Sequence, residues 1–290
     1  MSRATSFGER LSNAMAARGP LCVGIDPHPA LLAEWGLPAD ASGVERFALT
    51  AVAALAGEIA VLKPQSAFFE TYGSAGIAVL ERVIAEAGAA GALVLLDVKR
   101  GDIGSTMAAY AAAYLADGAP LAADAVTLSP YLGFGSLDPA LELAASTGRG
   151  VFVLAMTSNP EGATVQHAVH GVAEGSNGGS AGRSVAQSMI DGAAARNAGA
   201  TPMGSVGVVI GATVGQVEIQ FENLNGPILA PGFGAQGATA ADLRAVFGPE
   251  LASVLPSSSR DVLRHGPDQR LLRDAALRVR DVVVAAAATV

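Results

Sequence analysis

The chain has 290 residues and a mass of 28.9 kDa, and 51% of its residues are hydrophobic while 15% are charged. This composition excludes an intrinsically disordered or collagen-like protein and supplies enough apolar residues for a large core. The net charge of −8 and the pI near 5.0 argue against a broad nucleic-acid-binding surface, which needs clustered positive charge.

The sequence contains no pattern typical of a membrane span or a secretory signal. Apolar runs such as residues 92–96 and 282–290 fall well short of the roughly 20 residues that cross a bilayer. The N-terminal stretch lacks the apolar core of a signal peptide. The single cysteine, Cys22, excludes an internal disulfide and is expected to be a small buried residue in a reducing compartment. We therefore expect a cytoplasmic protein that binds neither membrane nor nucleic acid.

Eight short apolar runs recur along the chain, each followed by a turn and a helical stretch. The runs are continuously apolar rather than alternating, which is typical of strands covered on both faces in a parallel sheet. Eight strand–helix units in a chain somewhat longer than the ~250 residues typical of a (β/α)8 TIM barrel predict that α/β fold, as a single domain over residues 1–290. The predicted strands are residues 21–26, 59–65, 93–99, 125–129, 151–157, 206–212, 228–232 and 254–258.

Helix signatures separate the predicted strands. Ser42 and Glu45 have the spacing of a capping box that opens one helix, and Thr239 with Asp242 opens another. From Asp268 onward, apolar residues recur at helical spacing with arginines on one side, which predicts a helix at the C-terminal end.

The interval after the fifth predicted strand is much longer than the others. Within it, residues 161–183 are polar and rich in glycine, and a helix resumes near Ser184. A loop this long in a compact domain is usually functional or disordered, and here it would emerge at the catalytic face of the barrel. We interpret residues 161–183 as a lid insertion within the barrel domain; a passive flexible insertion is the alternative.

The chain contains only two lysines, Lys63 and Lys99, among its 18 basic residues. A lysine ammonium differs from an arginine guanidinium because it is able to give up its proton and because it acts as a compact point charge. Both lysines lie at the ends of predicted strands, where the active site of such a barrel forms. They are therefore candidates for chemistry rather than for surface solvation.

The two lysines belong to a row of charged residues. Asp97 and Lys99 are two residues apart and would point to the same side of an extended strand. With Lys63 on the adjacent strand and Asp102 just beyond, the row alternates in sign, and such charges hold one another ionised. A structural salt-bridge network at the barrel rim is the alternative. Other polar residues near predicted strand ends are Asp26, Gln65, Thr127, Ser129, Thr157 and Ser158.

A glycine-rich loop follows the seventh predicted strand. Gly232, Gly234 and Gly237 satisfy GxGxxG, but a dinucleotide fingerprint belongs to the first unit of an open sheet. After strands seven and eight of a barrel, such a loop presents backbone N–H groups to a phosphate, and Arg260 would add a forked, charged contact. We predict a phosphate-binding site for a small molecule; a purely structural turn is the alternative.

Five segments in this order resemble the orotidine 5'-phosphate decarboxylases, in particular their longer bacterial branch with a DxKRGDIGxT motif. The resemblance runs from the first strand to the eighth. It implies a carboxy-lyase that converts orotidine 5'-phosphate to uridine 5'-phosphate, the last step of UMP biosynthesis in the pyrimidine pathway, with no metal or organic cofactor. The segments are GIDPHP at 24–29, KPQ at 63–65, DVKRGDIGST at 97–106, APGFGAQG at 230–237 and SSSR at 257–260.

The resemblance also implies roles for individual residues in the pyrimidine and ribose sites. Lys99 would donate the proton to C6 of the pyrimidine, and Asp97 would sit against the departing carboxylate. Lys63 would hydrogen-bond within the charged row and to the ribose, and Asp26 would accept from a ribose hydroxyl. Ser158 resembles the serine that contacts the pyrimidine ring.

Gln236 and Arg260 resemble the pair of residues that binds the substrate's phosphate in this family, and the backbone of Gly234 and Gly237 would lie next to them. Ala238 departs from the family pattern because a glycine is usual there.

The resemblance further implies a homodimer. Asp102, which completes the set of catalytic residues, would reach the ribose in the neighbouring subunit's site, and Ile103 and Thr106 would line that same site.

Two other functions remain open at this stage. A Mg²⁺-dependent keto-sugar-phosphate decarboxylase of the same barrel group would need oxygen ligands near the DxK motif, where the second strand offers lysine instead. A non-catalytic barrel that binds a phosphorylated ligand would not need the charged row. His167 and His170 have a metal-like spacing but lack a third ligand nearby, so no metal site is predicted.

Overall fold

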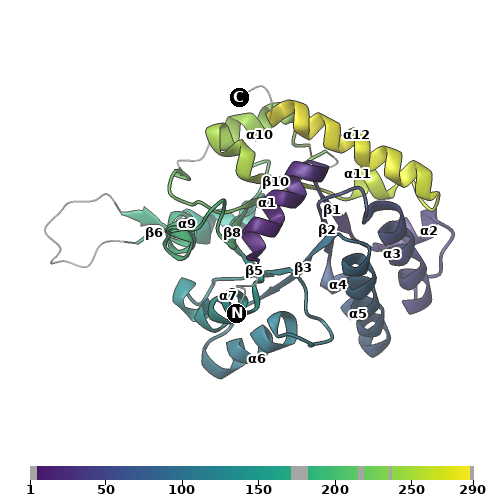
Figure 1. Ribbon diagram of the computed structural model, residues 1–290, viewed down its shortest axis with the longest axis horizontal. Coiled ribbons are helices and arrows are strands. Elements are labelled where there is room, and N and C mark those ends of the chain that lie inside the picture. Colours follow the sequence, from purple (N-terminus) through teal and green to yellow (C-terminus); the bar gives the residue numbers. More distant parts are fainter. Residues whose placement is uncertain (1–4, 171–181, 215–218, 235–236, 288–290) are drawn as a thin grey trace, which may run out of the picture.

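The computed structural model describes residues 5–170, 182–214, 219–234 and 237–287. Eight parallel strands close into a barrel in the order β1-β10-β9-β8-β5-β4-β3-β2, with helices packed around the outside (Figure 1). The predicted TIM barrel is therefore confirmed. The barrel strands are β1 (Cys22–Ile25), β2 (Val61–Pro64), β3 (Leu93–Arg100), β4 (Ala125–Leu128), β5 (Gly150–Met156), β8 (Val206–Ile210), β9 (Ile228–Pro231) and β10 (Val254–Ser258).

The helices cover the outer face of the barrel, and α12 contacts both α3 and α10, which closes their ring. No helix in the described part of the chain is long and apolar enough to cross a membrane. The described α-helices are α1 (Phe7–Arg18), α2 (Pro29–Glu34), α3 (Ala41–Leu55), α4 (Ser66–Glu70), α5 (Gly73–Ala89), α6 (Gly104–Leu115), α7 (Asp138–Thr147), α8 (Ala163–Gln166), α9 (Val185–Asn197), α10 (Ala240–Phe247), α11 (Arg260–Leu263) and α12 (Gln269–Ala287). The described residues also form three 3₁₀ turns, η1 (Phe134–Leu137), η2 (Pro160–Gly162) and η3 (Gly248–Ser253).

The helix caps confirm one sequence prediction and correct another. Thr239 and Asp242 form the predicted capping box of α10. The capping box predicted from Ser42 and Glu45 is wrong, because the carboxylate of Asp40 accepts hydrogen bonds from the Gly43 N–H and the Ser42 hydroxyl. An aspartate at the N-cap supplies both an acceptor and a negative charge beside the helix N-terminus.

The interval between β8 and β9 departs from the predicted strand–helix alternation. Its described residues, 211–214 and 219–227, contain no helix. This part of the chain instead forms turns, and Ala212 donates from its backbone to the carbonyl of Pro231 at the end of β9.

The predicted lid, residues 161–183, lies only partly within the described residues. Its first part forms α8, where the Gln166 side chain bonds the backbone N–H and the hydroxyl of Thr157 at the end of β5. Two short antiparallel strands, β6 (Val169–His170) and β7 (Arg183–Ser184), lie outside the barrel wall (Figure 1). Residues 171–181 are outside the described residues, so the lid stays a prediction.

Helix α1 closes the opposite end of the barrel. Phe7 and Leu11 are buried, and the Phe7 ring meets the edge of Phe152 at 6.0 Å between centroids. Cys22 lies in the same apolar cluster, fully buried as predicted, and burial raises the pKa of its thiol to about 12. Because apolar side chains fill this end of the barrel, a polar site is expected at the other end, where the carboxyl ends of the strands lie.

Candidate active site

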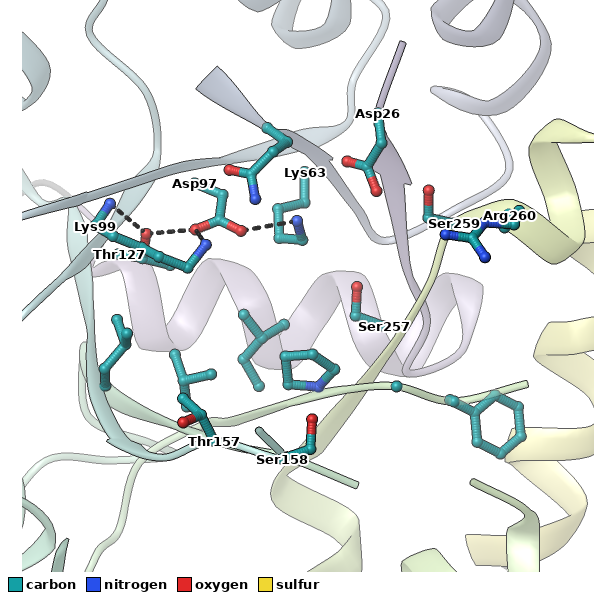
Figure 2. Close-up of a pocket in the computed structure, with 18 of the residues that line it drawn as sticks. Asp26, Lys63, Asp97, Lys99, Thr127, Thr157, Ser158, Ser257, Ser259 and Arg260 are labelled. Carbon is teal, nitrogen blue, oxygen red and sulfur yellow. Dashed lines mark hydrogen bonds and ion pairs between the residues drawn. The ribbon is translucent and has the colours of Figure 1, made fainter. Parts of the chain in front are cut away.

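A cavity of about 370 Å³ opens at the carboxyl ends of the barrel strands. Figure 2 shows a row of charged side chains along one wall, with Thr157 and Ser158 on the facing wall. The facing wall also carries apolar side chains from β5, β8 and β9, among them Leu154, Val209 and Leu229. The cavity therefore sets a strongly polar surface against a largely apolar one.

Asp97 holds the two lysines of the chain together. Its Oδ2 lies 3.0 Å from Lys63 Nζ and its Oδ1 lies 2.6 Å from Lys99 Nζ. The side chains of Lys63 and Asp97 are almost fully buried, whereas that of Lys99 is 44% exposed and faces the cavity. The predicted convergence of Lys63, Asp97 and Lys99 is confirmed.

The two buried charges, Lys63 and Asp97, hold each other in the ionised state. Burial by itself raises the pKa of the Asp97 carboxyl, but Lys63 and Lys99 outweigh it and keep this pKa well below its usual range. Burial likewise lowers the pKa of Lys63, but the carboxylates of Asp97 and Asp26 raise it above its usual value. At neutral pH the buried part of the row is therefore an anion beside a cation.

The end of β3 reaches this arrangement through an irregular backbone. Leu96 pairs with Val126 and Arg100 pairs with Leu128, so three residues of β3 lie opposite a single residue of β4. Lys99 has a φ of 48°, in the left-handed region that costs a non-glycine residue roughly 1–2 kcal/mol. The extended geometry expected from the sequence at Lys99 is therefore wrong, although its side chain does meet Asp97.

Two neighbouring side chains, for which the sequence analysis predicts no specific role, complete the surroundings of Asp97 and Lys99. The Thr127 hydroxyl donates to Asp97 Oδ1 at 2.7 Å and accepts from the Lys99 backbone N–H at 3.0 Å. The Gln65 amide fits its neighbours when its NH₂ donates to the Asp97 carbonyl at 2.7 Å and its oxygen accepts from Lys99 Nζ at 3.3 Å. The only indication of these contacts in the sequence is that Thr127 and Gln65 are polar residues near the ends of predicted strands.

Asp26, at the end of β1, turns its carboxylate toward the cavity beside Lys63 (Figure 2). Its Oδ1 is buried and has no hydrogen-bond partner among the described residues. A buried carboxylate oxygen without a donor is costly, and a hydroxyl from a ligand in the cavity would satisfy it.

The cavity ends at the loop after β9 and at the start of α11. Gly232, Gly234 and Gly237 all have φ values between 81° and 101°, which favour glycine. Gly232 and Arg260 line the cavity, and Figure 2 places Arg260 beside Ser259 at the end nearest Asp26. Gln236, the expected second phosphate ligand, lies outside the described residues.

Asp102, Ile103 and Thr106 lie away from the cavity of their own chain. Ile103 is 61% exposed, and Asp102 accepts a hydrogen bond from the Ile103 backbone N–H. The fourth member of the predicted row does not pair with Lys99 within one chain: among the described residues Lys99 pairs with Asp97, and Asp102 lies in the segment between β3 and α6, outside the cavity lining.

The described residues contain no group of three or more His, Cys, Asp or Glu side chains placed to hold a metal ion. His170, from the HxxH spacing, contacts the Ser188 hydroxyl at 2.6 Å.

Comparisons with known proteins agree over almost the whole chain. Residues 19–274 match the model of the orotidine 5'-phosphate decarboxylase / HUMPS family. The chain is 61% identical over 272 residues to the orotidine 5'-phosphate decarboxylase of Streptomyces coelicolor, covering 94% of this chain and 95% of that protein. The enzyme of the same name from Salinispora arenicola is 61% identical over 274 residues, with coverage of 94% and 95%.

A solved structure matches equally well. The crystal structure of a protein from Streptomyces avermitilis, provisionally named orotidine 5'-phosphate decarboxylase, superposes with a TM-score of 0.92 and 58% sequence identity. The match covers 98% of this chain and 96% of that one.

The lowered pKa of Asp97 predicts a specific pH dependence of stability. Between its usual pKa of 3.8 and the lower folded value, the unfolded chain binds the proton first, so the stabilisation by Asp97 is present above about pH 4 and is lost as the pH falls further. Urea unfolding at pH 7, 5, 4 and 3 should show the free-energy difference between wild type and Asp97→Asn decreasing over the last steps. Asp281→Asn, at an exposed carboxylate, is the control; a difference for Asp97→Asn that stays constant with pH would contradict the assignment.

Proposed function

The chain belongs to the orotidine 5'-phosphate decarboxylase / HUMPS family, and we propose that it catalyses the cofactor-independent decarboxylation of orotidine 5'-phosphate to uridine 5'-phosphate. One observation carries this proposal: Asp97 is held between the ammonium groups of Lys63 and Lys99 in a cavity that also reaches Arg260 and a glycine loop. The product places the reaction in pyrimidine biosynthesis. A cytoplasmic location is part of the same proposal.

The chemistry requires a fixed cation beside C6 of the pyrimidine. When carbon dioxide leaves, the electron pair of the broken bond stays on C6 in the plane of the ring, where conjugation cannot spread it. A positioned positive charge stabilises that pair as it develops. The Lys99 ammonium, which faces the cavity and is held by Asp97, is suited to this position.

Lys99 also supplies the proton that completes the reaction. The bond between C6 and the carboxylate carbon breaks, carbon dioxide leaves, and a proton moves from Lys99 Nζ to C6. Neutral Lys99 then recovers a proton from water, which its 44% exposed side chain is able to contact. An arginine in this place would keep its proton because its pKa is too high.

Asp97 orients the ammonium of Lys99 and would lie against the departing carboxylate. Because its own charge is held by two lysines, it stays an anion when the substrate binds. Lys63 pairs with the other oxygen of Asp97 and balances the negative charge of this buried carboxylate. It would also hydrogen-bond the ribose.

The rest of the cavity would bind the remainder of the substrate. Asp26 has an unpartnered oxygen for a ribose hydroxyl, and Ser158 lies on the facing wall for a contact with the pyrimidine. Arg260 and the glycine loop would take the phosphate, with Gln236 as the proposed second ligand. Binding energy from these remote groups would be used to close the lid of residues 161–183 and exclude water.

A homodimer is part of the proposal, with Asp102, Ile103 and Thr106 reaching the neighbouring subunit's site. The apolar side chains of Ile103, Tyr131 and Leu132 are 61%, 79% and 53% exposed. Ile103 follows β3, and Tyr131 and Leu132 follow β4. The two loops start side by side, because the Ser129 N–H of one donates to the Arg100 carbonyl of the other at 2.8 Å. Apolar side chains gathered on one face are typical of a protein interface.

The two other functions are not favoured. Both carboxylate oxygens of Asp97 already face ammonium groups, which is unfavourable for a Mg²⁺ ion that needs oxygen ligands at this motif. A barrel that only bound a phosphorylated ligand would gain nothing from a buried carboxylate between two lysines.

The proposed function is tested by following the absorbance of orotidine 5'-phosphate with purified protein in the presence of EDTA. The wild type should turn over the substrate, and Lys99→Ala should lower kcat by at least about 10³-fold while circular dichroism shows an intact fold. Lys99→Arg should be inactive as well, because it keeps the charge without a transferable proton. Lack of turnover by the wild type would reject the function, and near-normal turnover by Lys99→Ala would reject the role of the lysine.

Arg260→Ala should act mainly on substrate binding. Loss of a charge-assisted contact to the phosphate is expected to raise KM by roughly 10- to 100-fold. Arg264→Ala, which removes an exposed arginine one helical turn away, is the matched control and should leave KM unchanged. An unchanged KM in Arg260→Ala would remove this residue from the phosphate site.

A shared active site predicts complementation between two inactive variants. In co-expressed heterodimers of Lys99→Ala and Asp102→Ala, one of the two sites combines an intact Lys99 with an intact Asp102 from the other subunit. Random pairing should then restore about a quarter of the wild-type activity. Activity no higher than that of the separate variants, in a preparation shown by gel filtration to be dimeric, would contradict the role of Asp102.

A further inference from the structure

Thr127 lies on β4 opposite the irregular end of β3, and its side chain is buried at 1% exposure. It is the only residue of β4 between the pairs Leu96–Val126 and Arg100–Leu128, so it lies opposite the three-residue segment 97–99 of β3. Its hydroxyl lies within hydrogen-bond distance of both a side chain and a backbone group of this segment.

The directions of these two hydrogen bonds are fixed by chemistry. The backbone N–H of Lys99 is always a donor, so the Thr127 oxygen accepts at 3.0 Å. The ionised carboxylate of Asp97 is only an acceptor, so the single hydroxyl proton of Thr127 points to its Oδ1 at 2.7 Å. The Thr127 hydroxyl therefore donates one hydrogen bond and accepts another, and both partners lie in the segment 97–99 of β3.

The two contacts bear on both ends of the Lys99 side chain. At the backbone, the Thr127 oxygen satisfies the N–H of a residue that sits at a φ of 48°, where the regular β3–β4 ladder is interrupted. At the ammonium, Asp97 Oδ1 is the oxygen that pairs with Lys99 Nζ at 2.6 Å, and Thr127 bonds that same oxygen.

We propose that Thr127 is a positioning residue for Lys99: its hydroxyl fixes the backbone and the carboxylate that together aim the ammonium at the reacting carbon. This inference rests on the proposed decarboxylase function. The proposed ribose and phosphate contacts come from Asp26 after β1, from Lys63 on β2 and from the loops after β9 and β10. Among the described residues, the Thr127 hydroxyl bonds Lys99 and Asp97 and none of these groups. Loss of the hydroxyl therefore lowers kcat and leaves KM nearly unchanged.

The test is a steady-state comparison of Thr127→Val, which is nearly isosteric but lacks the hydroxyl, with Thr127→Ser, which keeps it. Thr127→Val should lower kcat by about 10- to 100-fold, the usual size of an effect from a misplaced catalytic group, with KM within about 3-fold. Thr127→Ser should restore kcat to within about 3-fold of the wild type. Thr147→Val, which removes a threonine hydroxyl bonded to Leu143 within α7, is the control and should match the wild type.

Each outcome decides a separate point. No turnover by the wild type in the same assay rejects the proposed function itself. Turnover by the wild type with equal kcat in the valine and serine variants, or a fall in both variants together, rejects the role of the hydroxyl. If Thr127→Val does not fold, Thr127→Ala replaces it, and equal kcat in the alanine and serine variants rejects the inference in the same way.

Discussion

The structure depends on one buried carboxylate shared by two ammonium groups. Asp97 accepts a hydrogen bond from Lys63 at Oδ2 and from Lys99 at Oδ1, so neither oxygen is left without a partner. Burying a single charge is expensive, and burying the opposite charges of Lys63 and Asp97 becomes tolerable only because they are paired and hydrogen-bonded. This pairing lowers the pKa of Asp97 and raises that of Lys63, and it leaves the more exposed Lys99 facing the cavity.

The barrel supplies what this arrangement needs. Parallel strands place their carboxyl ends at one opening, and α1 fills the opposite one with Phe7 and Leu11. A regular β3 would not place Asp97 and Lys99 against the same threonine of β4; the extra residues of β3 and the left-handed backbone of Lys99 do so. Local strain of this kind persists where surrounding contacts hold it, and here Thr127 and Asp97 provide them.

The sequence predicts much of this account because its strongest signals are local. Eight continuous apolar runs predict the barrel, and the rarity of lysine singles out Lys63 and Lys99. The N-cap of the helix α3 is a local competition between two patterns, in which Asp40 rather than Ser42 caps the helix. Other parts that the sequence does not predict depend on contacts between distant segments, since the irregular pairing of β3 involves Thr127 of another strand. The position of Asp102 outside the cavity lining depends on how the chain continues from β3 to α6.

The proposed reaction depends on the position of the Lys99 ammonium relative to the carbon that loses carbon dioxide. The most direct measurement is a crystal structure of the protein with uridine 5'-phosphate bound. We expect Lys99 Nζ within roughly 3–3.5 Å of C6, the separation of groups placed to react, with Asp97 still between the two lysines. A complex with C6 against the apolar wall of Leu154 and Val209, and Lys99 turned to solvent, would contradict it.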